Sequence, residues 1–140
     1  MSDLLVPFDN SPSARRALDH AVELAGQRDG TRLRVLAVLD AVGVDTRELV
    51  DAAEIDRVLS AEASAVLDPA RAAVGPTGVT CTYHSATGMP AQSIAAHARE
   101  HAVDQIVMGT RGLGTIPGLL LGSVAQRVVL LAGCPVTLVK

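Results

Sequence analysis

Aromatic residues are almost missing from this chain, which has one Phe, one Tyr and no Trp among 140 residues. The formal net charge is −3, so a broad basic surface is missing as well. Proteins that bind nucleic acid usually combine basic surface with aromatic rings on which bases stack, which makes this chain a poor candidate for that class. Its core must be built from Val, Leu, Ile and Ala, which suit helices packed on a sheet.

Cysteines and long apolar runs are also scarce. Cys81 and Cys134 stand too far apart for a CxxC or zinc-type motif, so we expect two buried free thiols. No run approaches the roughly 18 apolar residues of a membrane span. The first residues lack the basic start and apolar core of a secretory signal. The sequence therefore predicts one domain over residues 1–140, in the cytoplasm and without a membrane partner.

Acidic residues are missing from the last quarter of the chain. Residues 105–140 contain no Asp or Glu, whereas Arg111, Arg127 and Lys140 lie there. Within this part, residues 109–123 read Gly-Thr-Arg-Gly-Leu-Gly-Thr-Ile-Pro-Gly-Leu-Leu-Leu-Gly-Ser, and a helical pattern follows directly. Glycine backbone, a positive helix end and no repelling charge are what an anionic ligand needs.

Short apolar runs alternate with helical patterns along the whole chain. Ser11-Pro12 is a typical helix start, with Ser as the N-cap and Pro at the first helical position. The expected strands are residues 4–8, 33–39, 79–84, 105–108 and 135–139, and the expected helices are 12–28, 47–74 (which Pro69 kinks or divides), 90–101 and 123–132.

This strict alternation predicts a single α/β domain, an open parallel sheet with helices on both faces. Ligands of such sheets bind at the carboxyl ends of the strands, where the strand order reverses. The segments Pro7-Phe8-Asp9 and Met108-Gly109-Thr110 are the best candidates to flank that crevice.

Two common phosphate-binding motifs do not fit the glycine run. A P-loop needs a lysine after its last glycine, and Lys140 is the only lysine in the chain. The dinucleotide fingerprint is begun by Gly112-Leu113-Gly114, but its third glycine is displaced to Gly118 and no acidic residue follows.

The remaining spacing, Gly109-x2-Gly112-x9-Gly122-Ser123, resembles the ATP-binding signature of the universal stress protein family. The resemblance covers the whole chain. It also includes Val6-Pro-Phe-Asp9-Asn-Ser11, Val38-Leu39-Asp40, Gly88-Met-Pro90, Asp104 to Gly112 and Gly133-Cys-Pro-Val136.

This resemblance implies a five-stranded, Rossmann-like parallel sheet in the order 3-2-1-4-5. It further implies ATP as the ligand, with Mg²⁺, and a homodimer formed through the last strand, Val136 to Val139. We expect an ATP-binding stress-response regulator whose nucleotide orders residues 110–121 and so shifts a dimer or partner-binding state. A weak ATPase that uses the same pocket and a nucleotide-free dimeric scaffold are the alternatives.

Several candidate site residues have an expected role. Gly109 and Gly112 let the backbone lie against ribose and phosphates, and Gly122 and Ser123 offer N–H groups at the helix start. By resemblance, Asp9 lies at the ribose or near a phosphate-bound metal, although it could instead only cap the helix entry. Arg111 either pairs with a phosphate or is solvated. The full candidate set is Pro7, Asp9, Val38, Met108, Gly109, Thr110, Arg111, Gly112, Gly122, Ser123 and Val124.

The sequence predicts no catalytic residues and no metal ligands. It contains no Gly-x-Ser-x-Gly nucleophile motif. His97 and His101 stand four apart on an expected helix, but no third ligand is evident beside them. We expect His20 and His84 at solvated or edge positions.

Overall fold

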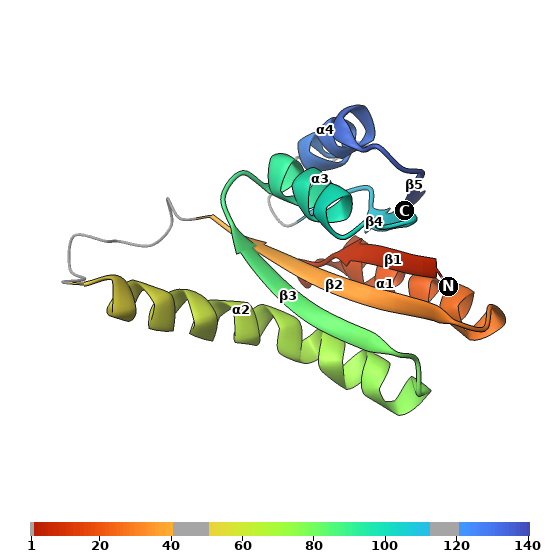
Figure 1. Ribbon diagram of the computed structural model, residues 1–140, viewed down its shortest axis with the longest axis horizontal. Helices are drawn as coiled ribbons and strands as arrows, with labels where there is room; N and C mark the ends of the chain where they lie inside the picture. Colours follow the sequence, from red (N-terminus) through yellow and green to blue (C-terminus); the bar gives the residue numbers. More distant parts are fainter. Residues whose placement is uncertain (1, 41–50, 113–120) are drawn as a thin grey trace.

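The computed structural model describes residues 2–40, 51–112 and 121–140. Its centre is a parallel sheet of five strands in the order β3-β2-β1-β4-β5 (Figure 1), which confirms the predicted α/β fold and strand order. The strands are β1 (Ser2–Pro7), β2 (Thr31–Leu39), β3 (Cys81–Thr87), β4 (Gln105–Gly109) and β5 (Val136–Val139). The order of the strands reverses between β1 and β4, which lie side by side at the centre.

Helices cover both faces of the sheet (Figure 1). Helices α1 (Pro12–Gln27) and α2 (Ala52–Val74) pack on one face, and a short 3-10 turn, η2 (Gly75–Thr77), follows α2. Helices α3 (Pro90–Glu100) and α4 (Ser123–Leu131) pack on the other face. Within the described ranges, no helix has the length and apolar character needed to cross a membrane.

Alternation along β2 builds both cores. Leu33, Val35 and Ala37 pack with α1 and α2, whereas Leu36 belongs to the core beneath α3 and α4. Leu33, Val35 and Leu36 are each fully buried. Successive strand residues face opposite sides, so a continuous apolar run can serve two helix layers at once.

Helix α1 starts where the Ser-Pro pair predicts. The Ser11 side chain accepts a hydrogen bond from the Ala14 N–H at 3.2 Å, and Pro12 takes the first helical position. The cap orients α1 directly after β1, so the loop between them lies at the carboxyl edge of the sheet.

Several predicted boundaries were wrong. The third strand runs from Cys81 to Thr87 instead of over residues 79–84, because its register with β2 continues to the pair Leu39–Thr87. In the described part, the predicted helix 47–74 begins at Ala52, and residues 47–50 lie outside the described residues. Asp51 is its N-cap, accepting from the Glu54 N–H at 2.8 Å. Pro69 does not divide α2, which continues to Val74.

The two cysteines are unpaired, as predicted, but both are only half-buried. Partial burial raises the pKa of both the Cys81 and the Cys134 thiol. Cys81 lies on β3 at one edge of the sheet, and Cys134 precedes β5 at the other. An edge strand has a neighbouring strand on one side only, which leaves these thiols partly accessible.

Candidate functional site

A cavity of about 730 Å³ opens at the carboxyl ends of β1 and β4. It lies at the reversal of the strand order, where α/β sheets usually bind ligands. A volume of this size is within the usual range for small-molecule sites. The structure brings all eleven predicted site residues to its lining: Pro7, Asp9, Val38, Met108, Gly109, Thr110, Arg111, Gly112, Gly122, Ser123 and Val124.

Eight further residues outside the candidate set line the cavity, and of these only Phe8 belongs to a segment expected to flank it: Phe8, Ser11, Ala14, Leu36, Asp40, Pro90, Ile94 and Ala125. Two of them carried a usable signal. Leu36 is two positions before Val38 and so shares its face of β2. Ile94 follows Pro90 by one helical turn, so both lie on one side of α3.

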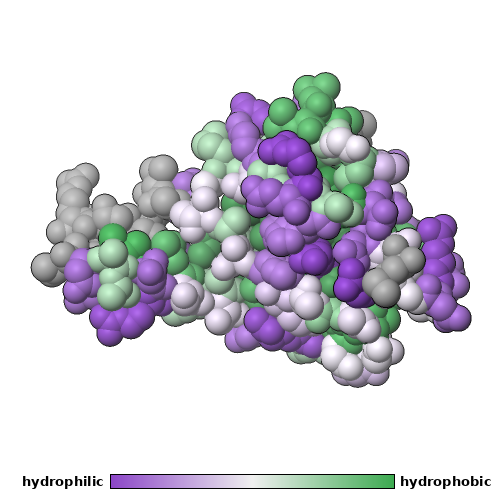
Figure 2. Space-filling view, in the orientation of Figure 1, coloured by the Kyte–Doolittle hydropathy of each residue, from purple (hydrophilic) through white to green (hydrophobic). Residues whose placement is uncertain are grey.

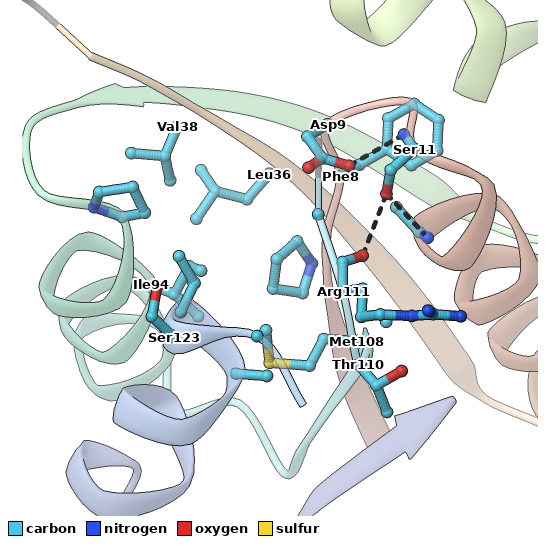
Figure 3. Close-up of a pocket in the computed structure, with 18 of the residues that line it drawn as sticks. Phe8, Asp9, Ser11, Leu36, Val38, Ile94, Met108, Thr110, Arg111 and Ser123 are labelled. Carbon is cyan, nitrogen blue, oxygen red and sulfur yellow. Dashed lines mark hydrogen bonds between the residues drawn. The ribbon is translucent and has the colours of Figure 1, made fainter. Parts of the chain in front are cut away.

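One side of the cavity is apolar. Leu36, Val38 and Ile94 lie together there, and Met108 lies below them (Figure 3). Leu36 is fully buried, and Ile94 and Met108 are 3% and 5% exposed. These side chains come from β2, β4 and α3, so the sheet and a helix fix the wall together. A flat apolar group such as a base could be buried against it.

The opposite side carries the polar turn from β1 to α1 (Figure 3). The Ser11 N–H donates to Asp9 Oδ1 at 2.9 Å. Asn10 has a φ of 63°, in the left-handed region that Asn tolerates better than most residues. One oxygen of Asp9 therefore holds the entry to α1, which is the second of the two roles predicted for it.

The other oxygen of Asp9 faces Gly112. A Cβ placed on Gly112 would lie 2.7 Å from Asp9 Oδ2, closer than real Cβ contacts come. Gly112 therefore leaves room for a carboxylate at the cavity edge, in addition to any room it leaves for a ligand. The side chain of Asp40, exposed at the end of β2, lines the same cavity.

Gly109 has a different reason to be glycine from the one predicted. A Cβ there would lie 2.7 Å from the Ser13 carbonyl carbon and 2.9 Å from the Ala14 nitrogen. The crowding comes from helix α1, so Gly109 allows β4 and α1 to pack closely. Gly109 also lines the cavity, so its predicted approach to ribose and phosphate stays a prediction.

The segment after β4 is held to α1 by hydrogen bonds. The Arg111 N–H donates to Ser13 Oγ at 3.2 Å, and the Ser13 hydroxyl also bonds the Arg111 carbonyl. Ser11 Oγ contacts the same carbonyl at 3.4 Å. The Arg111 side chain is exposed and points away from the cavity (Figure 3). Arg111 thus contributes backbone to the site, while its charge faces solvent.

Helix α4 begins at the cavity. Gly122 is its N-cap and makes no side-chain capping bond. The Gly122 N–H was predicted to face the ligand, but it donates to the Thr110 carbonyl at 2.6 Å. Ser123, Val124 and Ala125 line the cavity, and the N–H groups of a first helical turn have no acceptor within the helix. The positive end of the α4 dipole therefore borders the site.

Residues 113–120, which form most of the predicted nucleotide-ordered segment 110–121, lie outside the described residues. In the part of the chain that is described, no group of three His, Cys, Asp or Glu side chains is arranged to hold a metal ion. Asp9 and Asp40 supply two carboxylates to the cavity edge, which a ligand-borne Mg²⁺ could meet.

Comparison with known proteins identifies the class that this fold and cavity define. The model of the universal stress protein family matches residues 1–140. The chain is 33% identical to the universal stress protein YxiE of Bacillus subtilis, over 98% of this chain and 97% of YxiE. The chain belongs to the universal stress protein family.

Solved structures agree with this assignment. The hypothetical protein MJ0577 matches with a TM-score of 0.86 and 27% identity, over 99% of this chain and 95% of that one. A universal stress protein solved in complex with cAMP matches with a TM-score of 0.74 and 27% identity, covering 99% and 97% of the two chains. One from Archaeoglobus fulgidus, in complex with dAMP, has a TM-score of 0.69 and 26% identity, covering 100% and 98%.

Proposed function

We propose that this protein is a cytoplasmic ATP-binding regulator that binds Mg·ATP in the cavity between β1 and β4. The observation that carries the proposal is the pairing, in one cavity, of an apolar wall with the start of helix α4. The proteins of the same fold solved with cAMP and dAMP support adenine nucleotides as the ligand class.

The phosphates belong at the start of α4. The N–H groups of Ser123 and Val124 and the Ser123 hydroxyl supply donors there, and the helix dipole favours negative charge. Because residues 105–140 contain no acidic residue, this part of the chain adds no repelling charge. Several donors and a helix end make a suitable anion site without a lysine.

The adenine belongs against the opposite wall. Val38 and Ile94 offer apolar contact, and the backbone of Val38 at the end of β2 can read the edge of the base. Asp9, between the wall and α4, suits the ribose or the Mg²⁺ carried by the phosphates. The carboxylates of Asp9 and Asp40 are compatible with slow ATP hydrolysis. The Arg111 side chain points away from the cavity (Figure 3) and so does not stabilise phosphoryl transfer there.

The regulated state is a homodimer formed through β5. This strand lies at the edge of the sheet, and its residues are half-buried. The Pro135 carbonyl accepts from Ile106 on β4, and the Val139 carbonyl accepts from Thr110 just after β4. The alternate residues Val136 and Leu138 therefore turn their backbone groups outward. Beside β5, the end of α4 exposes Val129, Leu130 and Leu131, and apolar surface gathers over this helix (Figure 2). A second copy would cover both features.

Isothermal titration of Mg·ATP into the wild-type protein and Gly122→Val tests the nucleotide site. A valine at Gly122, which is buried and lines the cavity, would add bulk at the start of α4, where we propose that the phosphates bind. We expect micromolar affinity for the wild type and at least about a tenfold loss in the variant, or about 1.4 kcal/mol of binding free energy.

Gly133→Val is the matched control, because a Cβ at Gly133 meets no atom within 4 Å and this glycine lies beyond the far end of α4. It should bind Mg·ATP like the wild type, and circular dichroism should show all three proteins folded. Equal affinity in the wild type and Gly122→Val would refute the placement of the phosphates. No heat of binding in any of the three would favour the nucleotide-free scaffold.

A further inference from the structure

Three histidines gather between α3 and β3, away from the cavity. The ring centroids of His97 and His101 are 4.2 Å apart, those of His84 and His97 are 5.1 Å apart, and those of His84 and His101 are 6.2 Å apart. We call these three residues the histidine cluster. His97 and His101 come from α3 and its C-cap, and His84 comes from β3. The cluster thus joins the end of one helix to an edge strand.

The polar partners of the cluster fit uncharged rings. His84 Nε2 lies 2.7 Å from Thr82 Oγ1 and 3.5 Å from Arg34 Nη1. A guanidinium can only donate, so the Arg34 contact suits an Nε2 of His84 that carries no proton. His97 Nε2 is buried and has no hydrogen-bond partner within the described structure. An added proton on Nε2 of His84 would therefore face the Arg34 guanidinium, and an added proton on Nε2 of His97 would have no acceptor among the described residues.

The charges around the cluster oppose protonation. Arg34 on β2 is in contact with His84, and its own carboxylate partner is Asp3 on β1, at 3.8 Å. Among residues 2–40, 51–112 and 121–140, no carboxylate forms an ion pair with any of the three rings. On α3 itself two further charges lie near its end, Arg99 and Glu100, and both are exposed. Arg99 opposes a positive ring, and the Glu100 carboxylate faces solvent without an ion pair to any of the three rings.

We propose that the histidine cluster is an acid-sensitive contact, which holds the end of α3 on β3 while its rings are neutral and releases it when they become charged. Once charged, the rings repel each other at 4–6 Å and repel Arg34, and the partnerless His97 nitrogen must be hydrated. The remaining contacts of α3 are those of its apolar face, Ala91, Ile94, Ala95 and Ala98.

The direction of the titration agrees with this geometry. Burial first, and then the neighbouring rings and Arg34, lower the pKa of His97 to about 4, and burial with the Arg34 charge lowers that of His84. The C-terminal dipole of α3 acts in the opposite direction, but at about 0.3–1 kcal/mol it amounts to less than one pKa unit. The unfolded chain takes up these protons near pH 6.5, so folding stability falls as the pH drops from about 6.5 toward 4.

Helix α3 also reaches the nucleotide cavity. Pro90 and Ile94 line the cavity at one end of the helix, and His97 follows Ile94 by three residues. A release of the helix end would therefore loosen the apolar wall, so acid should weaken nucleotide binding. This second consequence rests on the proposed function, whereas the acid-sensitive contact itself does not.

Urea unfolding of the full chain without nucleotide, from pH 8 to pH 5, tests the contact. His97→Gln removes the titrating ring, and His20→Gln, on α1 outside the cluster, is the matched control. Between pH 7 and pH 5, the equilibrium constant for unfolding should increase about tenfold more in the wild type and His20→Gln than in His97→Gln. A tenfold difference corresponds to one pKa unit, or about 1.4 kcal/mol of stability. Parallel pH profiles for all three proteins would overturn the proposal.

Proton NMR titration of the wild-type histidines tests the acid-sensitive contact even if His97→Gln does not fold. The ring signals of His97 should titrate with a midpoint of about 4, and those of His84 should titrate below the ordinary value for histidine. Ordinary midpoints for both residues would contradict the proposal. In a second arm, the affinity for Mg·ATP should fall more between pH 7.5 and 5.5 in the wild type than in His97→Gln. Equal losses of affinity in the two proteins would refute the coupling between the cluster and the cavity. No binding at pH 7.5 would refute the proposed function, and the acid-sensitive contact would then be judged by urea unfolding and NMR titration alone.

Discussion

Gly109, at the end of β4, lies so close to Ser13 of α1 that no side chain fits between them. The same serine bonds both backbone groups of Arg111, two residues further along. This pair of contacts joins the strand that precedes the glycine run to the helix that follows β1. The floor of the cavity is therefore set by packing between two parts of the chain about 100 residues apart.

The close approach predicts a costly Gly109→Ala substitution. The added methyl would press on the backbone of Ser13 and Ala14, so the free energy of unfolding should fall by about 1–3 kcal/mol. Gly26→Ala on α1 is the control, because a Cβ there meets nothing within 4 Å and alanine favours the helix by about 0.5–1 kcal/mol. Urea denaturation should give opposite signs for the two variants, and a neutral Gly109→Ala would contradict the packing described.

Ser13→Ala isolates the hydrogen bonds from the packing. The variant removes a buried hydroxyl and leaves the Arg111 backbone without its partner on α1, so we expect a loss of about 1–3 kcal/mol of stability. Amide hydrogen exchange should show faster exchange at Arg111. Unchanged exchange at this amide would show that the contact with α1 does not hold the segment in solution.

The sequence predicted the fold well, but it did not predict why particular residues occupy their positions. Strand order and helix layers followed from alternation, because apolar periodicity reflects burial directly. The third strand was misplaced because residues 85–87, Ser-Ala-Thr, lack an apolar signal, and pairing with β2 alone makes them a strand. The start of α2 carried a signal that was missed, since Asp51 with Glu54 three residues later is an N-cap pattern.

The site was predicted as a set of residues, but not in its contacts. All eleven predicted residues line one cavity because strand ends at a reversal of strand order must meet there. The roles of Gly109 and Gly122 depend on long-range partners, Ser13 and the Thr110 carbonyl, which spacing does not reveal. The histidine cluster likewise joins a strand and a helix that the sequence analysis treated separately.

Thiol reactivity tests the partial burial of the cysteines. Because burial raises the pKa of Cys81 and Cys134, less thiolate is present near neutral pH than in a free thiol. Iodoacetamide at pH 8 should alkylate both more slowly than a small cysteine peptide, and urea should remove the difference. Faster reaction than the peptide at either cysteine would show that its environment stabilises the thiolate instead.

The apolar end of α4 predicts how the proposed homodimer can be disrupted. Leu130 is 84% exposed, so Leu130→Asp should leave the monomer folded but place a charge in the proposed interface. Sedimentation velocity should show a dimer for the wild type and a shift toward monomer for this variant. Ala61→Asp, at an exposed position of α2, should remain dimeric. A Leu130→Asp protein that is as dimeric as the wild type would exclude α4 from the interface.

A crystal structure of the wild-type protein grown with saturating Mg·ATP would locate the nucleotide and so test the proposed placement. Phosphate oxygens should lie within hydrogen-bond distance of the Ser123 and Val124 amides, and the adenine ring should lie against Val38 and Ile94. A cavity filled by the protein's own side chains, or a nucleotide bound at another place on the molecule, would contradict this placement.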